Sequence, residues 1–228
     1  METSASDPAV PATTPAATES GDLGAPLYIA WQVTNECNLA CLHCIEESGP
    51  GKAFHDELTD EQVFRVLEQV MDHEVPYLSF SGGEPMIHRR FFDMAEYVCG
   101  RNGQLKIETN GHYLEPDNCA RLKELGVKAV QVSLDGASRE TFNRMRVRGD
   151  FDRMIEGVKN LGAAGVPIEI NYSPTSFNAH EIGVSVDLAA ELGAYSFVVV
   201  YRRVGRYRSG RRTVGRGPRE SEKLHGLS

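Results

Sequence analysis

The stretch LYIAWQVTNECNLACLHC, residues 27–44, decides the fold because it joins a strand to a cysteine-rich loop. Leu27–Thr34 is rich in apolar, aromatic and β-branched residues, which favours a strand. Three cysteines, Cys37, Cys41 and Cys44, follow within eight positions. The cysteines are therefore expected at the carboxyl end of the first strand of whatever sheet the chain forms.

Outward from this stretch, strand patterns alternate with helix patterns. The further strands predicted are Tyr77–Ser81, Leu105–Thr109, Ala129–Leu134, Val166–Tyr172 and Tyr195–Tyr201. The helices predicted are Asp60–His73, Arg90–Cys99, Glu115–Leu125, Phe151–Ala164 and Ala179–Leu192. Such alternation predicts an α/β fold, a partial (β/α)6 TIM-like barrel of parallel strands with helices outside. The loops after the strands then form one active face.

Composition sets the boundaries of this core. Residues 1–25 are rich in Ala, Thr, Pro and Ser without an apolar period, and we expect a disordered leader. Residues 26–201 form the expected barrel. Residues 202–228 carry nine Lys or Arg against two Asp or Glu, which indicates a basic, poorly structured tail. The alternation would continue with a sixth helix after Tyr201, but the sequence there has no helical pattern. The sequence leaves open whether the chain is naturally short, truncated or altered there.

Location and partners follow from what the sequence lacks. No stretch is apolar enough for a membrane span, and Met1–Ala25 has neither the positive charge nor the apolar run of a secretion signal. We therefore expect a cytoplasmic protein without a membrane partner. The basic tail could bind a polyanion, but a solvated tail is the more ordinary interpretation, so nucleic acid is not expected as a partner.

The cysteine triplet indicates metal chemistry rather than disulfides. Five cysteines, three of them crowded together, make a poor disulfide framework. Thiolates suit iron–sulfur clusters and zinc. Three cysteines on one loop can hold three corners of a cubane and leave the fourth iron open to a ligand. The alternative is a zinc site completed by His43, His55 or a distant cysteine, although structural zinc sites usually bring two paired C-x₂-C motifs.

Three more motifs follow predicted strands in order. They are Ser81-Gly82-Gly83-Glu84-Pro85, Thr109-Asn110-Gly111 and Ser133-Leu134-Asp135-Gly136. Each has an ordinary explanation as a tight turn or a helix cap. Together with C-x₃-C-x₂-C after the first strand, they resemble the radical S-adenosylmethionine (radical SAM) superfamily, in the branch of peptide-maturation, quinone-cofactor and haem-modifying enzymes.

The resemblance implies a set of site residues. Cys37, Cys41 and Cys44 would bind a [4Fe–4S] cluster. The remaining candidates would contact S-adenosylmethionine or the substrate: Gly82, Gly83, Glu84 and Pro85 at its amino group, Thr109 and Asn110 near cofactor or substrate, Ser133 and Asp135 near ribose and carboxylate, Arg146 at the carboxylate, and Asn171 as a further contact. A satisfied core residue is the equal alternative for Asn171. His43 is expected to assist the loop without binding iron. Cys99 and Cys119, on helices, are expected to be buried structural thiols.

The implied chemistry is reductive cleavage of S-adenosylmethionine to a 5′-deoxyadenosyl radical that takes hydrogen from an organic substrate. The resemblance places the enzyme in the biosynthesis or modification of a cofactor, peptide or secondary metabolite. A small-molecule or peptide substrate and a reducing partner such as flavodoxin or ferredoxin would be needed. Two alternatives stay open. One is a single-cluster tailoring enzyme, such as a sugar-acid or nucleoside decarboxylase or dehydrogenase. The other is a zinc-binding or electron-transfer module without radical chemistry.

Overall fold

The computed structural model describes residues 25–200. Its six strands are β1 (Tyr28–Thr34), β2 (Tyr77–Gly82), β3 (Gln104–Thr109), β4 (Ala129–Ser133), β5 (Ile168–Tyr172) and β6 (Ser196–Val199). The helices are α1 (Asp60–Asp72), α2 (Phe91–Cys99), α3 (Pro116–Leu125), α4 (Arg139–Met145), α5 (Phe151–Ala164) and α6 (Ile182–Glu191). Two short 3₁₀ helices complete the series, η1 (Pro85–Ile87) and η2 (Ala179–Glu181).

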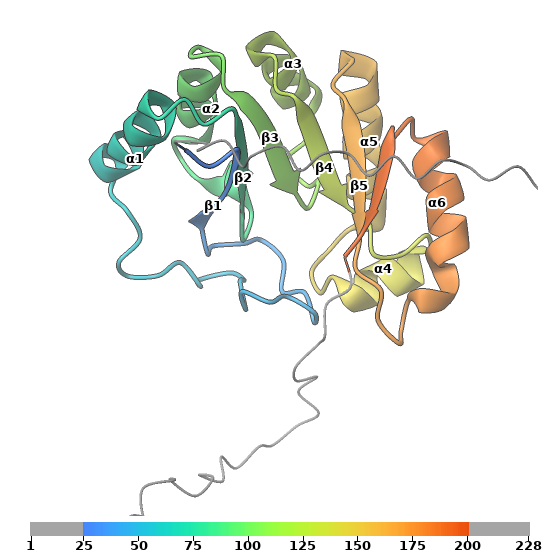
Figure 1. Ribbon diagram of the computed structural model, residues 1–228. Helices are drawn as coiled ribbons and strands as arrows, with labels where there is room; N and C mark the ends of the chain where they lie inside the picture. Colours follow the sequence, from blue (N-terminus) through green and yellow to red (C-terminus); the bar gives the residue numbers. More distant parts are fainter. Residues whose placement is uncertain (1–24, 201–228) are drawn as a thin grey trace, which may run out of the picture.

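The six strands form one parallel sheet in the order β1-β2-β3-β4-β5-β6. When neighbouring strands follow chain order and every crossover has the same hand, all the helices lie on one face. Figure 1 shows the sheet curving, with α1, α2, α3, α5 and α6 around its outer side. Within residues 25–200 β1 does not pair with β6, so the barrel is open. The predicted α/β fold with a partial barrel is confirmed.

The core lies between the sheet and these helices because the strands alternate. In β3 the side chains of Leu105 and Ile107 are buried on the helix side, while Lys106 and Glu108 lie on the opposite face. The same alternation in β5 buries Ile168 and Ile170 and leaves Glu169 and Asn171 on the concave side. Helix residues that pack on the sheet include Leu67, Met94, Val98, Leu122, Val158 and Leu161. The inner face is therefore polar, which suits it to hold a polar ligand.

Local signals explain where the helices begin and end. Thr59 and Gln62 form a capping box at the start of α1, and the Asp150 side chain caps α5. Gly126 ends α3 in the left-handed conformation that favours glycine. Helix α4 was not predicted, although Ser138 caps its N-terminus by accepting from the backbone N–H of Thr141.

The leader predicted for residues 1–25, all but Ala25, and the predicted tail 202–228 lie outside the described residues. Both stay predictions. No helix in the part of the chain that the structure describes is long and apolar enough to cross a membrane.

Candidate active site at the carboxyl end of the strands

The cysteine loop is fixed against the end of β2 by a close backbone approach. The N–H of Gly83 donates to the carbonyl of Thr34 at 2.8 Å, and the N–H of Glu84 donates to the carbonyl of Glu36 at 2.9 Å. A Cβ atom at Gly82 would lie 2.4 Å from the Thr34 carbonyl oxygen, and one at Gly83 would lie 2.2 Å from that of Glu36. The two glycines are thus required to bring β2 against the segment that leads into Cys37.

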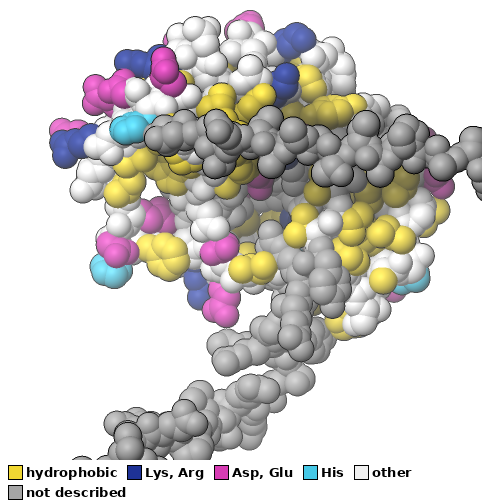
Figure 2. Space-filling model, viewed as in Figure 1, with side chains coloured by type: hydrophobic (Ala, Val, Ile, Leu, Met, Phe, Trp, Pro, Cys, Tyr) yellow, Lys and Arg dark blue, Asp and Glu magenta, His cyan; other side chains and the backbone are white. Residues whose placement is uncertain are grey.

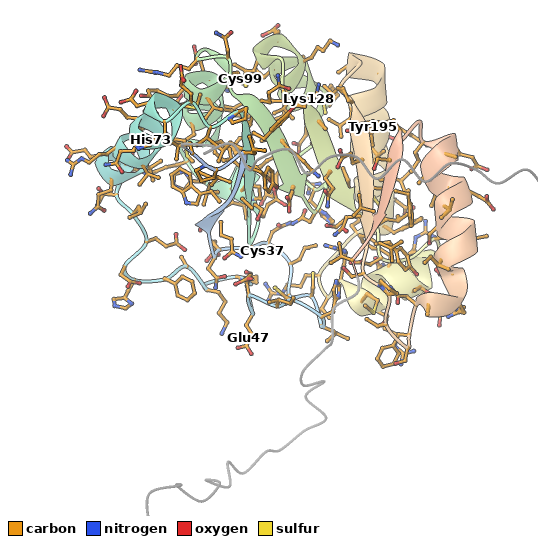
Figure 3. The ribbon with its side chains drawn as sticks, viewed as in Figure 1. Cys37, Glu47, His73, Cys99, Lys128 and Tyr195 are labelled. Carbon is orange, nitrogen blue, oxygen red and sulfur yellow. The ribbon has the colours of Figure 1, made fainter. Side chains whose placement is uncertain are left out.

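The far side of the loop is attached to the C-terminal end of α4. The N–H of Ala40 donates to the carbonyl of Val147 at 2.9 Å, and the N–H of Leu42 donates to that of Met145 at 3.0 Å. Figure 3 labels Cys37 just beyond the carboxyl end of β1 and Glu47 farther along the same loop. The loop is therefore held at two places, just before Cys37 by the end of β2 and on either side of Cys41 by the end of α4.

Each of the three thiols has a nitrogen donor. The Cys37 Sγ accepts from the N–H of Leu39 at 3.4 Å and from the Asn110 amide at 3.8 Å. The Cys44 Sγ accepts from the N–H of Ser48 at 3.3 Å, and the Cys41 Sγ lies 3.9 Å from the Arg146 Nη1. Donors of this kind stabilise thiolates that bind iron–sulfur clusters.

Burial affects the same thiols in the opposite direction. It raises the pKa of Cys37 to about 11, against the lowering effect of its hydrogen-bond donors. It also raises the pKa of Cys41, although Arg146 opposes that shift. The metal-free thiols of Cys37 and Cys41 are therefore neutral, and binding to iron would replace their protons.

Side chains from the cysteine loop and the ends of β1 to β5 enclose a hollow of about 860 Å³, counting the space open to solvent. Figure 2, in the same view as Figure 1, shows hydrophobic side chains over the region of β6 and α6 and also along the upper part of the molecule. The lining of the hollow is mostly polar and includes Cys37, Cys41, Cys44, Gly82, Gly83, Thr109, Asn110, Ser133, Arg146 and Asn171. The structure thus brings ten of the thirteen predicted site residues to one place.

Glu84, Pro85 and Asp135 do not line the hollow; all three are buried beside it. The Glu84 carboxylate accepts from Thr109 Oγ1 at 2.9 Å, from the N–H of Asn110 at 2.8 Å and from the N–H of Met86 at 3.2 Å. Its complete burial raises its pKa to about 7, although these donors lower it in part. Glu84 therefore joins the end of β2 to the end of β3 and is not exposed to a ligand.

Asp135 joins four segments at the centre of the site. Its Oδ2 lies 2.6 Å from Arg146 Nη2 and 2.8 Å from His43 Nε2, and its Oδ1 accepts from the N–H of Ser173 at 2.7 Å. Burial alone would raise the pKa of Asp135, but Arg146, His43 and Ser173 together hold it well below its usual range. The carboxylate is thus ionised and fixes Arg146 and His43 in place.

Three buried polar atoms around the hollow have no hydrogen-bond partner among the described residues: His43 Nδ1, Arg146 Nε and Asn171 Oδ1. Buried polar groups are normally paired, so unpaired ones that converge on a hollow indicate a polar ligand. Arg146 Nε is a donor that suits a carboxylate. Asn171 Oδ1 is an acceptor that suits a hydroxyl or an amino group. An amino acid joined to a nucleoside offers a carboxylate, an amino group and hydroxyl groups.

The hollow also contains polar residues that the motifs did not identify. Gln32, Glu108 and Gln131 line it from β1, β3 and β4. Gln32 pairs in register with Ser81 of β2, and Glu108 pairs with Gln131. The Glu108 carboxylate accepts from the Ser79 hydroxyl at 2.7 Å. The alternation in Leu105–Thr109 could have placed Glu108 on the inner face, but no motif distinguished it.

Of the other two cysteines, Cys119 is buried as expected, whereas Cys99 is only partly buried. Cys119 is part of the hydrophobic core, and Cys99 packs against it. Burial raises the pKa of each to about 11. Among residues 25–200, no three His, Cys, Asp or Glu side chains converge as one metal ion requires. Thiolates are the ligands that iron–sulfur clusters use, so the donor set of three cysteines fits such a cluster.

Residues 31–182 match the family model described as the radical SAM superfamily. The chain belongs to the radical SAM superfamily. Membership of this family implies S-adenosylmethionine and an iron–sulfur cluster.

Curated relatives include an AdoMet-dependent heme synthase of Methanosarcina barkeri, which is 34% identical over 78% of this chain and 51% of that protein. The mycofactocin maturase MftC of Mycobacterium tuberculosis is 32% identical over 81% of this chain and 47% of its own length. The chain thus spans about half the length of these radical SAM relatives.

Solved structures show the same fold. The crystal structure of Streptococcus suis SuiB bound to S-adenosylmethionine superposes with a TM-score of 0.70 at 20% identity, over 83% of this chain and 44% of that one. Native anSMEcpe with bound AdoMet superposes with a TM-score of 0.62 at 20% identity, over 75% of this chain and 50% of that one. At this identity the likeness establishes the radical SAM fold alone.

Proposed function

We propose that this chain forms the catalytic barrel of a radical SAM enzyme, in which Cys37, Cys41 and Cys44 bind a [4Fe–4S] cluster and the hollow binds S-adenosylmethionine. The observation that carries the proposal is the convergence of three donor-supported thiols with the unpaired Arg146 Nε, His43 Nδ1 and Asn171 Oδ1. When bound and reduced, the cluster supplies the electron that cleaves the carbon–sulfur bond of S-adenosylmethionine and so generates a 5′-deoxyadenosyl radical.

The residues of the chain provide binding and orientation. Arg146 is held by Asp135 with its Nε free, so it suits the carboxylate of the methionyl group. The backbone at Gly82 and Gly83 borders the hollow beside the cysteines, where it can receive the amino group. Ser133 and Asn171, paired across β4 and β5, are suited to hydroxyl groups.

The substrate is proposed to be a peptide or a cofactor precursor. The relatives named for haem and mycofactocin formation support a biosynthetic role, and one structural neighbour, SuiB, has been solved with its precursor peptide bound. The polar inner face, with Gln32, Glu108 and Gln131, suits a substrate that offers hydrogen-bond donors. A flavodoxin or ferredoxin is the proposed reductant.

The test is anaerobic reconstitution with iron and sulfide, followed by reductant and S-adenosylmethionine, with 5′-deoxyadenosine measured by mass spectrometry. Wild type should form the product, and Cys41→Ala should form none. Cys99→Ala, a matched change in a cysteine outside the hollow, should retain it. Absence of product from a cluster-loaded wild type would refute the proposal.

A further inference from the structure

Asn110 reaches from the end of β3 to the cysteine loop, more than seventy positions away in the chain. Its amide nitrogen donates to Asn38 Oδ1 at 2.8 Å and approaches the Cys37 Sγ at 3.8 Å. Its amide oxygen accepts from the N–H of His112 at 3.0 Å. Because the oxygen is used by its own turn, the nitrogen must face the loop, and both amide hydrogens have acceptors there.

The turn that carries Asn110 is fixed from three sides. The Glu84 carboxylate accepts from the backbone N–H of Asn110, and the ring of His112 contacts the Asn110 carbonyl at 3.3 Å. The other nitrogen of that ring accepts from the N–H of Asp150 at 2.8 Å. Gly111 adopts a φ of +86°, and a Cβ there would lie 3.1 Å from Met154 Cγ. The amide therefore has little freedom to leave the loop.

The hydrogen bonds of Asn110 distinguish it from the residues whose buried polar atoms are unpaired. Arg146, His43 and Asn171 each present an unpaired buried atom, whereas the polar atoms of the Asn110 side chain are all engaged. Asn110 lines the hollow and is nearly inaccessible to solvent. Its side chain is thus committed to the cysteine loop and not to S-adenosylmethionine.

On the basis of the proposed function, we propose that Asn110 is a positioning residue that holds Cys37 in place. By donating to the Cys37 Sγ, it also raises the reduction potential of the cluster. Reduction adds negative charge to the cluster and its ligands, and a hydrogen-bond donor to a ligand sulfur stabilises the reduced form. Glu84 acts on the cluster through the same residue, since it fixes the backbone of Asn110.

The experiment is a redox titration of the reconstituted full chain, followed by electron paramagnetic resonance without S-adenosylmethionine. Asn110→Ala removes the donor, and Asn110→Asp keeps the shape but replaces the donor with an acceptor. Asn160→Ala is the matched control, because that amide donates to the carbonyl of Leu114 at 2.9 Å, away from the hollow.

At a fixed potential, the ratio of reduced to oxidised cluster should be about tenfold lower in Asn110→Ala than in wild type, which is a shift of 59 mV for a one-electron couple. The reduction potential of Asn110→Asp should be lower still, and that of Asn160→Ala should match wild type. Unchanged or raised potentials in the Asn110 variants would overturn the inference while the proposed function stood. A wild type that binds no cluster would overturn both.

A further measurement decides the case in which neither Asn110 variant keeps a cluster. The thermal midpoints of the cluster-free Asn110 variants are then compared with the midpoint of cluster-free Asn160→Ala. A midpoint no lower than that of the control means that the defect is confined to the cysteine loop, as the inference expects. A markedly lower midpoint means that Asn110 supports the fold in general, which overturns the inference.

Discussion

The buried charges around Asp135 provide a sharp test of how the site is built. Asp135→Asn keeps an oxygen that can accept from the N–H of Ser173, but it removes the negative charge that lies 2.6 Å from Arg146 and 2.8 Å from His43. The side chain of Arg146 is only 8% exposed and that of Asp135 is 0% exposed. The variant therefore leaves a guanidinium buried without its anion.

Breaking a buried ion pair in this way costs about 3–5 kcal/mol of unfolding free energy. In a domain of this size, each kcal/mol shifts the melting midpoint by about 2–4 °C. We expect Asp135→Asn to lower the midpoint, followed by circular dichroism, by at least about 6 °C. The matched control is Asp152→Asn, which breaks the exposed pair with Arg139. It should leave the midpoint unchanged, because exposed pairs contribute little.

The pH dependence adds a second criterion. The pKa of Asp135 is lowered in the folded state, so the stability that it provides is present above the unfolded pKa, about 4, and is lost as the pH falls further. The difference between wild type and Asp135→Asn should persist from pH 5 to 8 and shrink only in stronger acid. Equal midpoints for Asp135→Asn and Asp152→Asn near pH 7 would refute the reasoning that Asp135 anchors the site.

Two further predictions concern the segment after β2. Because burial raises the pKa of Glu84 to about 7 from 4.5, its carboxyl is protonated in the folded state and ionised in the unfolded state between those values. The contribution of Glu84 to stability should therefore fall by up to about 3 kcal/mol as the pH rises from 4.5 to 7, seen as the difference between wild type and Glu84→Gln. Glu84→Gln should remove that slope in urea titrations, and an unchanged slope would contradict the assignment. Gly83→Ala should prevent cluster binding and lower the melting midpoint, because its Cβ would lie 2.2 Å from a backbone oxygen. Gly162→Ala, whose Cβ meets nothing closer than 3.8 Å in helix α5, should keep both the cluster and the midpoint, and equal damage from the two changes would refute the close-approach argument.

Much of the fold could be predicted because its elements carry local signals. The alternation in Leu105–Thr109, the glycine after α3 and the apolar stripe of α5 all reflect interactions within a few residues. The sequence pattern does not predict helix α4 because its seven residues, RETFNRM, are mostly polar and bury only Phe142 and Met145. Its signal was the cap at Ser138, which resembles an ordinary turn in the sequence.

The site was predicted less completely because the roles of its residues depend on contacts across the chain. The motifs led to the hollow, but they could not show that the carboxylates of Glu84 and Asp135 are directed to other protein groups and do not line it. Those orientations depend on partners such as Thr109 and Arg146, which the sequence places at unrelated positions. The sequence could equally not show which polar atoms remain unpaired, and these atoms distinguish ligand contacts from supporting residues.

The most direct test of the central claim is the iron and sulfide content of the anaerobically reconstituted chain, measured together with its absorbance. The account predicts about four irons and four sulfides per chain. It also predicts that Cys37→Ala, Cys41→Ala or Cys44→Ala loses the cluster, whereas Cys119→Ala keeps it. A colourless protein that binds one zinc ion, or a cluster that survives loss of Cys41, would contradict the account.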